Sequence, residues 1–135
     1  MIREYIIVFV IMGIIDAIFL KFMVNYAWKD MIKDIQISVF NPNMKYLIIP
    51  YILMTLAIVI YVLPQIKRNS VLKDSILYGG LLGLIIYGVF DFTNLILFTR
   101  YKLSVGMGDM LWGGILFTIV TFLSKSSLLF LKDLI

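Results

Sequence analysis

The sequence contains no cysteine and no histidine, and these two absences narrow the chemistry that is open to it. Without cysteine the chain has no disulfide, no thiolate nucleophile and no thiolate ligand for zinc or an iron-sulfur cluster. Without histidine it lacks the most common general base and the most common metal-binding side chain. Carboxylates, amides, tyrosines and lysines remain, and the sequence therefore predicts no metal site and no cofactor.

Charged residues are also scarce, at 15% of the 135 residues, whereas 62% are hydrophobic and the mean hydropathy is +1.03. This composition is typical of proteins whose solvent is lipid. A bilayer core is about 30 Å thick and takes roughly 20 helical residues to cross. We therefore predict an all-α integral membrane bundle of four transmembrane helices, in a single domain over residues 1–135.

Four apolar stretches carry the predicted spans, at about residues 5–22, 46–63, 76–98 and 107–130. Pro64 ends the second span, and Gly106 and Gly108 weaken the helix before the fourth. Between the first two spans Trp28 and Met31 recur at helical spacing opposite charged residues. This pattern predicts an amphipathic segment at the membrane interface.

The basic residues are divided evenly between the two sides of the predicted bundle. Those on the side of the termini and the second loop are Arg3, Lys67, Arg68, Lys73, Lys125 and Lys132. Those on the other side are Lys21, Lys29, Lys33, Lys45, Arg100 and Lys102. The positive-inside rule therefore assigns no orientation. These residues flank apolar spans, where they would meet anionic lipid headgroups, so the net charge of +4 does not predict a nucleic-acid partner.

The third predicted span carries polar and small residues on one helix face. Residues at spacings of three and four along it are Gly80, Gly83, Tyr87, Asp91 and Asn94. The glycines let a neighbouring backbone approach closely, and Gly79 with Gly83 also fits the small-xxx-small pattern of helix packing. The sequence therefore predicts a packing surface at one end of this span and a polar site at the other.

Carboxylates lie within three of the four predicted spans, at Asp16, Asp91 and Asp109. A charged side chain in the bilayer is costly, so each is expected to face the bundle interior and to find a partner there. Asp91 and Asp109 are expected at similar depth because the third and fourth helices run in opposite directions. Trp112 lies three residues after Asp109, so all of these groups are candidates for one pocket.

Two interpretations of this cluster remain open. Carboxylates held close together in a low dielectric favour the binding of a proton, a cation or a ligand. Alternatively, Asn94, Tyr87 and Trp112 only satisfy the carboxylates and fix the helix register, as an interhelical polar clasp. Asp109 has a further structural interpretation, because it follows two glycines and is placed to complement a helix N-terminus.

The hypotheses of function follow from these interpretations. The leading one is a binding or accessory component that holds a lipid or small molecule at a pocket formed by Asp16, Tyr87, Asp91, Asn94, Asp109 and Trp112. The second is a proton-coupled carrier or channel that uses Asp16 and Asp91, for which a homo-oligomer is expected because four helices are few. A structural membrane component with a polar clasp is the third. An enzyme acting on lipid is not favoured, because no nucleophile or metal signature is present.

The third and fourth spans also resemble the signature of a known family. Tyr87-Gly88-Val89-Phe90-Asp91-Phe92-Thr93-Asn94 fits its Tyr-x-x-x-Asp-x-Thr-Asn run, and Asp109-Met110-Leu111-Trp112-Gly113 fits its Asp-x-x-Trp-Gly motif. Asp16 and Leu63-Pro64 are similar to features of its first and second spans. The family consists of small predicted membrane proteins with a domain of unknown function. The resemblance implies a four-helix architecture and assigns no reaction.

Overall fold

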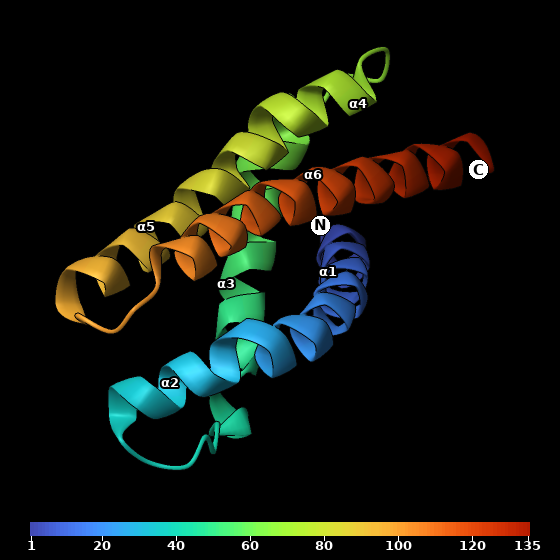
Figure 1. Ribbon diagram of the computed structural model, residues 1–135. Coiled ribbons are helices and arrows are strands. Elements are labelled where there is room, and N and C mark those ends of the chain that lie inside the picture. Colours follow the sequence, from blue (N-terminus) through green and yellow to red (C-terminus); the bar gives the residue numbers. More distant parts are fainter.

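The computed structural model describes residues 1–135 and is helical outside its short connections (Figure 1). The helical runs that are long and apolar enough to cross a membrane are Ile2–Gln36, Met44–Gln65, Val71–Leu97 and Leu103–Asp133. The structure contains no β-strand. The prediction of an all-α protein with four membrane-spanning helices is therefore confirmed.

The first run bends part-way along its length. Helix α1 (Ile2–Met23) passes through a π-helical turn (Val24–Trp28) into α2 (Lys29–Gln36). A π-helical turn inserts an extra residue and is a common cause of a sharp bend. Figure 1 shows that α2 leaves the direction of α1 after this turn. The predicted amphipathic segment is thus a helix that continues α1, and its place at the membrane interface stays a prediction.

The other three runs are built around α3 (Ile48–Ala57), α4 (Val71–Asp74) with α5 (Leu81–Leu97), and α6 (Leu103–Asp133). A π-helical turn follows α3, and another joins α4 to α5. Helix α6 begins at Leu103, so Gly106 and Gly108 lie inside it. A Cβ added at Gly106 would lie 3.3 Å from the Asp91 Cβ and 3.5 Å from Tyr101 Cε1, so the absence of a side chain lets α6 pack closely there.

Helices α5 and α6 lie side by side and antiparallel, and they form the most extensive helix pair of the fold (Figure 1). A Cβ at Gly83 would collide with the carbonyl group of Gly113. A Cβ at Gly79 would lie 2.6 Å from Thr121 Oγ1. The two backbones therefore touch where α5 and the preceding turn carry glycines, which is how small residues promote helix association in lipid.

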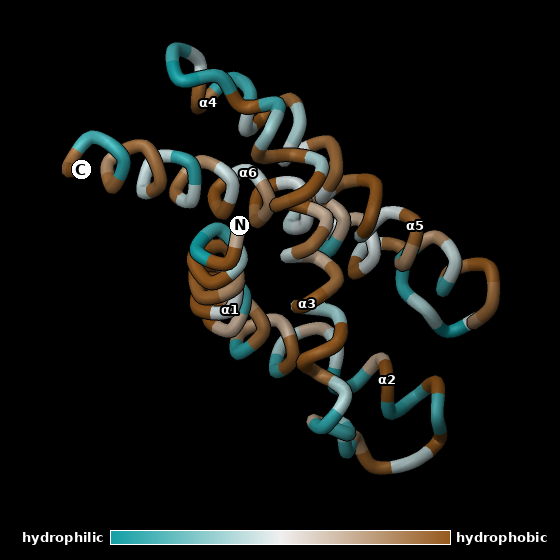
Figure 2. Tube along the Cα trace, turned by 180° about the vertical axis from the view of Figure 1, so that it is seen from behind, coloured by the Kyte–Doolittle hydropathy of each residue, from teal (hydrophilic) through white to brown (hydrophobic).

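Helix α3 crosses the α5–α6 pair, and α1 begins beside α6 and runs away from the pair (Figures 1 and 2). The shared core contains Met12 of α1, Ile58 after α3 and Phe117 of α6, all of which are fully buried. Large apolar side chains such as Ile14 and Ile85 are more than half exposed and would face lipid. Hydrophilic residues gather at the helix ends and connections (Figure 2).

Candidate functional site

Asp16 is the carboxylate with the most complete set of hydrogen bonds. It lies on α1 and is only 4% exposed. Tyr51 of α3 donates its hydroxyl to Asp16 Oδ2 at 2.7 Å, and Trp112 of α6 donates its indole N–H to Oδ1 at 3.0 Å. Phe19 stacks on the Trp112 ring with centroids 4.0 Å apart. Asp16 therefore joins three of the four membrane-spanning runs through its two oxygens.

Asp91 of α5 and Asp109 of α6 form a pair of neighbouring carboxyl groups. Asp91 is fully buried, and Tyr101 donates its hydroxyl to Asp91 Oδ1 at 2.6 Å. The other oxygen, Oδ2, has no N–H or O–H donor, and the carboxyl groups of Asp91 and Asp109 interact directly. One proton held between the two groups would satisfy both of them and would avoid two adjacent charges in a low dielectric.

Tyr101 lies in the connection between α5 and α6, outside the membrane-spanning runs. Burial, together with the hydrogen bond to Asp91, raises the pKa of the Tyr101 hydroxyl above its usual value. The hydroxyl therefore keeps its proton and remains a donor to Asp91. Its ring also packs edge-to-face against Trp28, with centroids 5.9 Å apart, which ties this connection to the turn before α2.

Tyr87 of α5 lines the same cavities as Asp16 and Asp109. Its ring packs against Gly113, where any added Cβ would collide with it, and edge-to-face against Phe117. The Tyr87 hydroxyl makes no hydrogen bond with the protein, and the Asp109 carboxyl group accepts none from an N–H or O–H donor. Both groups also line cavities, so they are in a position to bind a ligand.

Two cavities open beside these groups. The larger, of about 460 Å³, lies between α1, α3 and α5 and includes Pro50, Tyr51 and Met54; we call it the α3-side cavity. The smaller, of about 270 Å³, includes Trp28 and Phe40; we call it the α2-side cavity. The residues that line both are Asp16, Leu20, Tyr87, Phe90 and Asp109. The two cavities therefore meet at the same carboxylates and the same tyrosine.

Residues 1–125 match the family model described as "Predicted membrane protein (DUF2177)". The chain belongs to the DUF2177 family. No curated protein and no solved structure matches it. The family match and the four membrane-spanning runs together make this DUF2177 member an integral, multi-pass membrane protein.

Within this DUF2177 member the predicted site residues fall into two groups. Asp16, Tyr87 and Asp109 line both cavities. Asp91, Asn94 and Trp112 line neither; Asp91 and Trp112 lie behind the cavity wall as partners of Asp109 and Asp16. Asn94 is half-buried, one turn beyond Asp91, and makes no hydrogen bond with it.

Tyr51 and Tyr101 donate hydroxyls to the carboxylates but are not among the site residues predicted from the sequence. Tyr101 stands beside basic residues, a pattern typical of the interfacial aromatic belt. Tyr51 directly follows Pro50 in an uncharged span. A count of donors needed by three buried carboxylates would have pointed to tyrosines, because the spans contain no histidine or arginine to meet them.

Proposed function

We propose that this membrane protein binds an amphiphilic molecule taken from the lipid phase, and that it acts as a binding or accessory component. The observation that carries this proposal is the meeting of two apolar cavities at Asp16, Tyr87 and Asp109. Ligand sites are typically apolar cavities with a few convergent polar groups that fix the orientation of the ligand. This arrangement fits a molecule with an apolar body and one polar group.

The free groups at the site suggest what that polar group is. Asp109 offers carboxyl oxygens, and Tyr87 offers a hydroxyl that both donates and accepts. A ligand hydroxyl or amine would bind both of them and would restore the hydrogen bonds that the protein leaves unmade. The apolar body would lie along Leu20 and Phe90, which line both cavities. A lipid or lipophilic small molecule with a hydroxyl or amino group is therefore the proposed ligand class.

The remaining residues of the cluster have positioning roles in this proposal. Tyr51 and Trp112 each hold one of the two Asp16 oxygens. Tyr101 holds Asp91, which in turn contacts Asp109. Polar groups whose partners are already in place bind a ligand with little reorganisation. Asp109 is the anchoring residue in this proposal, because it lines both cavities and Asp91 lines neither.

Native mass spectrometry of protein purified in mild detergent tests this proposal. Wild type is expected to carry a defined lipid or small molecule, and Asp109→Asn and Tyr87→Phe are expected to lose most of it while remaining folded. Thr55→Val is the matched control, because Thr55 is a buried α3 hydroxyl that lines neither cavity. Unchanged ligand content in the folded Asp109→Asn and Tyr87→Phe variants would rule the proposal out.

The same experiment distinguishes binding from the polar clasp. In the clasp interpretation the carboxylates and tyrosines only stabilise helix packing. Neither wild type nor any variant would then carry a ligand, and Asp109→Asn would unfold more easily than wild type. Each interhelical hydrogen bond of this kind is worth about 1 kcal/mol in membranes. Loss of a ligand from a folded variant would therefore indicate binding. Loss of stability without any ligand would indicate the clasp.

A second function, proton-coupled transport, is supported by the direct contact between Asp91 and Asp109. A carboxyl group pair in a low dielectric is a natural site for the uptake and release of one proton. In proteoliposomes such a carrier would move protons or a coupled solute with a pH dependence that Asp91→Asn abolishes. Flux that does not depend on pH or on Asp91 would exclude this function.

A further inference from the structure

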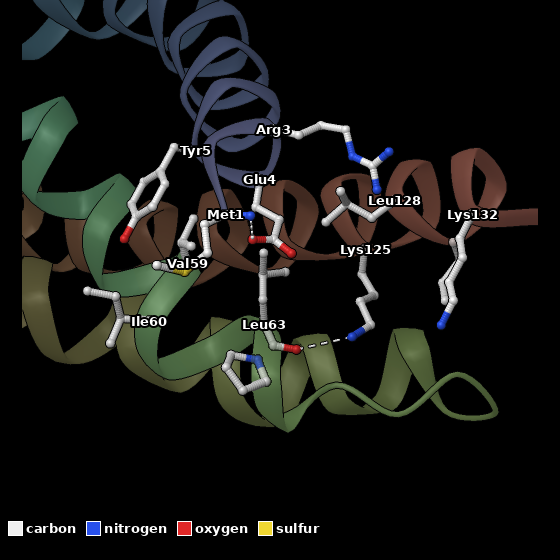
Figure 3. Close-up of a pocket in the computed structure, with 12 residues that line it drawn as sticks. Met1, Arg3, Glu4, Tyr5, Val59, Ile60, Leu63, Lys125, Leu128 and Lys132 are labelled. Atoms are coloured by element: carbon white, nitrogen blue, oxygen red, sulfur yellow. Dashed lines mark hydrogen bonds and ion pairs between the residues drawn. The ribbon is translucent and has the colours of Figure 1, made fainter. Parts of the chain in front are cut away.

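A third cavity lies at the opposite end of the bundle, away from the carboxylates (Figure 3). It has a volume of about 710 Å³ and lies between the first turns of α1, the end of the run that contains α3, and the last third of α6. Arg3, Lys125 and Lys132 line it, and Glu4 is its one carboxylate. No part of the proposed function uses this cavity.

The cationic side chains of this cavity are not neutralised by the protein. Neither Arg3, Lys125 nor Lys132 forms a salt bridge. By contrast, Arg68 at the same end of the molecule donates two hydrogen bonds to the Asp133 carboxylate, at 2.7 and 3.0 Å. Acidic residues are thus present at this end, but they leave the cavity cations free. The cavity therefore carries an excess of positive charge.

One of these cations is held in place. The Lys125 ammonium group donates to the Leu63 carbonyl oxygen at 3.2 Å, in the last turn of the run Met44–Gln65 (Figure 3). An ammonium group has three protons, so this bond leaves two for a ligand. Figure 3 shows Lys132 beside Lys125 on α6, while the Arg3 side chain reaches toward Leu128 from α1. Donors from two helices therefore face one space.

The rest of the lining is apolar and continues toward the bundle. Val59 and Leu63 are almost fully buried, and Leu128 and Leu129 are half-buried. Helix α6 has 31 residues. At a rise of about 1.5 Å per residue it is longer than the roughly 30 Å hydrocarbon core. A helix of this length can place its basic last turns at the depth of lipid headgroups, next to the apolar lining of the cavity.

We propose that this cavity binds an anionic phospholipid, with the headgroup phosphate at Arg3, Lys125 and Lys132 and the upper acyl chains along Val59, Leu63 and Leu128. Basic pockets between transmembrane helices are a recognised way to hold anionic headgroups. Charge complementarity selects the phosphate, and the adjoining apolar wall selects a lipid over a soluble anion. The site is independent of the proposed amphiphile site, because the two share no residue.

The test compares lipid binding by the full chain in mild detergent, using native mass spectrometry and titration with phosphatidylglycerol or phosphatidylcholine. The test variant is the double substitution Arg3→Gln with Lys132→Gln, which leaves the Lys125 contact with Leu63 intact. The matched control is Lys29→Gln with Lys33→Gln, which removes two exposed charges from α2 at the other end. Thermal unfolding checks that all proteins are folded.

Wild type and the control are expected to bind phosphatidylglycerol more tightly than phosphatidylcholine. The test variant is expected to bind phosphatidylglycerol about 25-fold more weakly, from roughly fivefold for each basic residue removed near the surface. Equal binding of the two lipids by wild type would overturn the proposal, as would an equal effect of the two double substitutions.

A further arm distinguishes a lipid from free phosphate. Inorganic phosphate is added at millimolar concentration and compared with potassium chloride at the same ionic strength, which screens charges to the same extent. The lipid proposal expects both salts to weaken phosphatidylglycerol binding equally. Displacement by phosphate alone would assign the cavity to a soluble anion and would overturn the lipid site.

Discussion

The indole nitrogen of Trp112 donates a hydrogen bond to Asp16 across 3.0 Å, which joins α6 to α1 over 96 residues of sequence. Tyr51 completes the pairing from α3, so both oxygens of one buried carboxylate are occupied. The contact connects the amphiphile site to the packing of the bundle, because Asp16 both lines the two cavities and holds three helices together. Trp112 lines neither cavity, so a substitution of Trp112 tests stability apart from direct ligand contact.

Trp112→Phe is expected to lower the free energy of unfolding by about 1 kcal/mol, because it removes one interhelical hydrogen bond while keeping an aromatic ring against Phe19. Equilibrium unfolding in mixed micelles of sodium dodecyl sulfate measures this change. Trp28→Phe is the control, since the Trp28 side chain makes no hydrogen bond. Equal effects of the two substitutions would mean that the bond to Asp16 contributes nothing beyond packing.

Tyr101→Phe is expected to destabilise the protein by about 1 kcal/mol and to loosen the start of α6, because Asp91 loses its only hydroxyl donor. Hydrogen exchange of the α5–α6 connection, measured by mass spectrometry, should rise in this variant. Tyr46→Phe serves as the control, because Tyr46 is exposed and without a hydrogen bond from its hydroxyl. A Tyr101→Phe protein with unchanged exchange at residues 98–106 would contradict this assignment.

Gly83→Ala is expected to disrupt the α5–α6 pair, because the added Cβ meets the Gly113 backbone, a collision that no side-chain rotation relieves. Overpacking of this kind typically costs about 1–3 kcal/mol. Gly13→Ala is a matched control on α1, where a Cβ meets nothing within 4 Å, and it is expected to stabilise the helix slightly. Opposite signs in the two unfolding measurements are the expected result.

Ile37→Gly is expected to stabilise the end of α2. Ile37 has a φ of 54°, a left-handed conformation that costs a branched side chain about 1 kcal/mol and costs glycine nothing comparable. Slower hydrogen exchange in residues 31–36 would show the effect. Ile18→Gly is the comparison in the middle of α1, where glycine is expected to destabilise the helix instead. Faster exchange at α2 in Ile37→Gly would count against this interpretation of the turn.

The sequence by itself determined the membrane character, the all-α class and the four spans, because these depend on composition and on the length of apolar runs. It also singled out Asp16, Asp91 and Asp109, since a carboxylate in an apolar span is conspicuous without any knowledge of its partners. The predicted small-residue face of the third span likewise needed only helical spacing. These properties are local, and they belong to each helix before it packs.

The tertiary structure alone decided which groups meet. Tyr51 and Trp112 bind Asp16, Tyr101 binds Asp91, and Tyr87 and Asp109 are left facing two cavities. In a soluble helix an apolar stripe marks the buried face, but in lipid both the buried and the exposed faces are apolar. The hydropathy pattern therefore does not predict the rotation and tilt of each helix. They depend on glycine contacts and hydrogen bonds between helices, which only the assembled bundle contains.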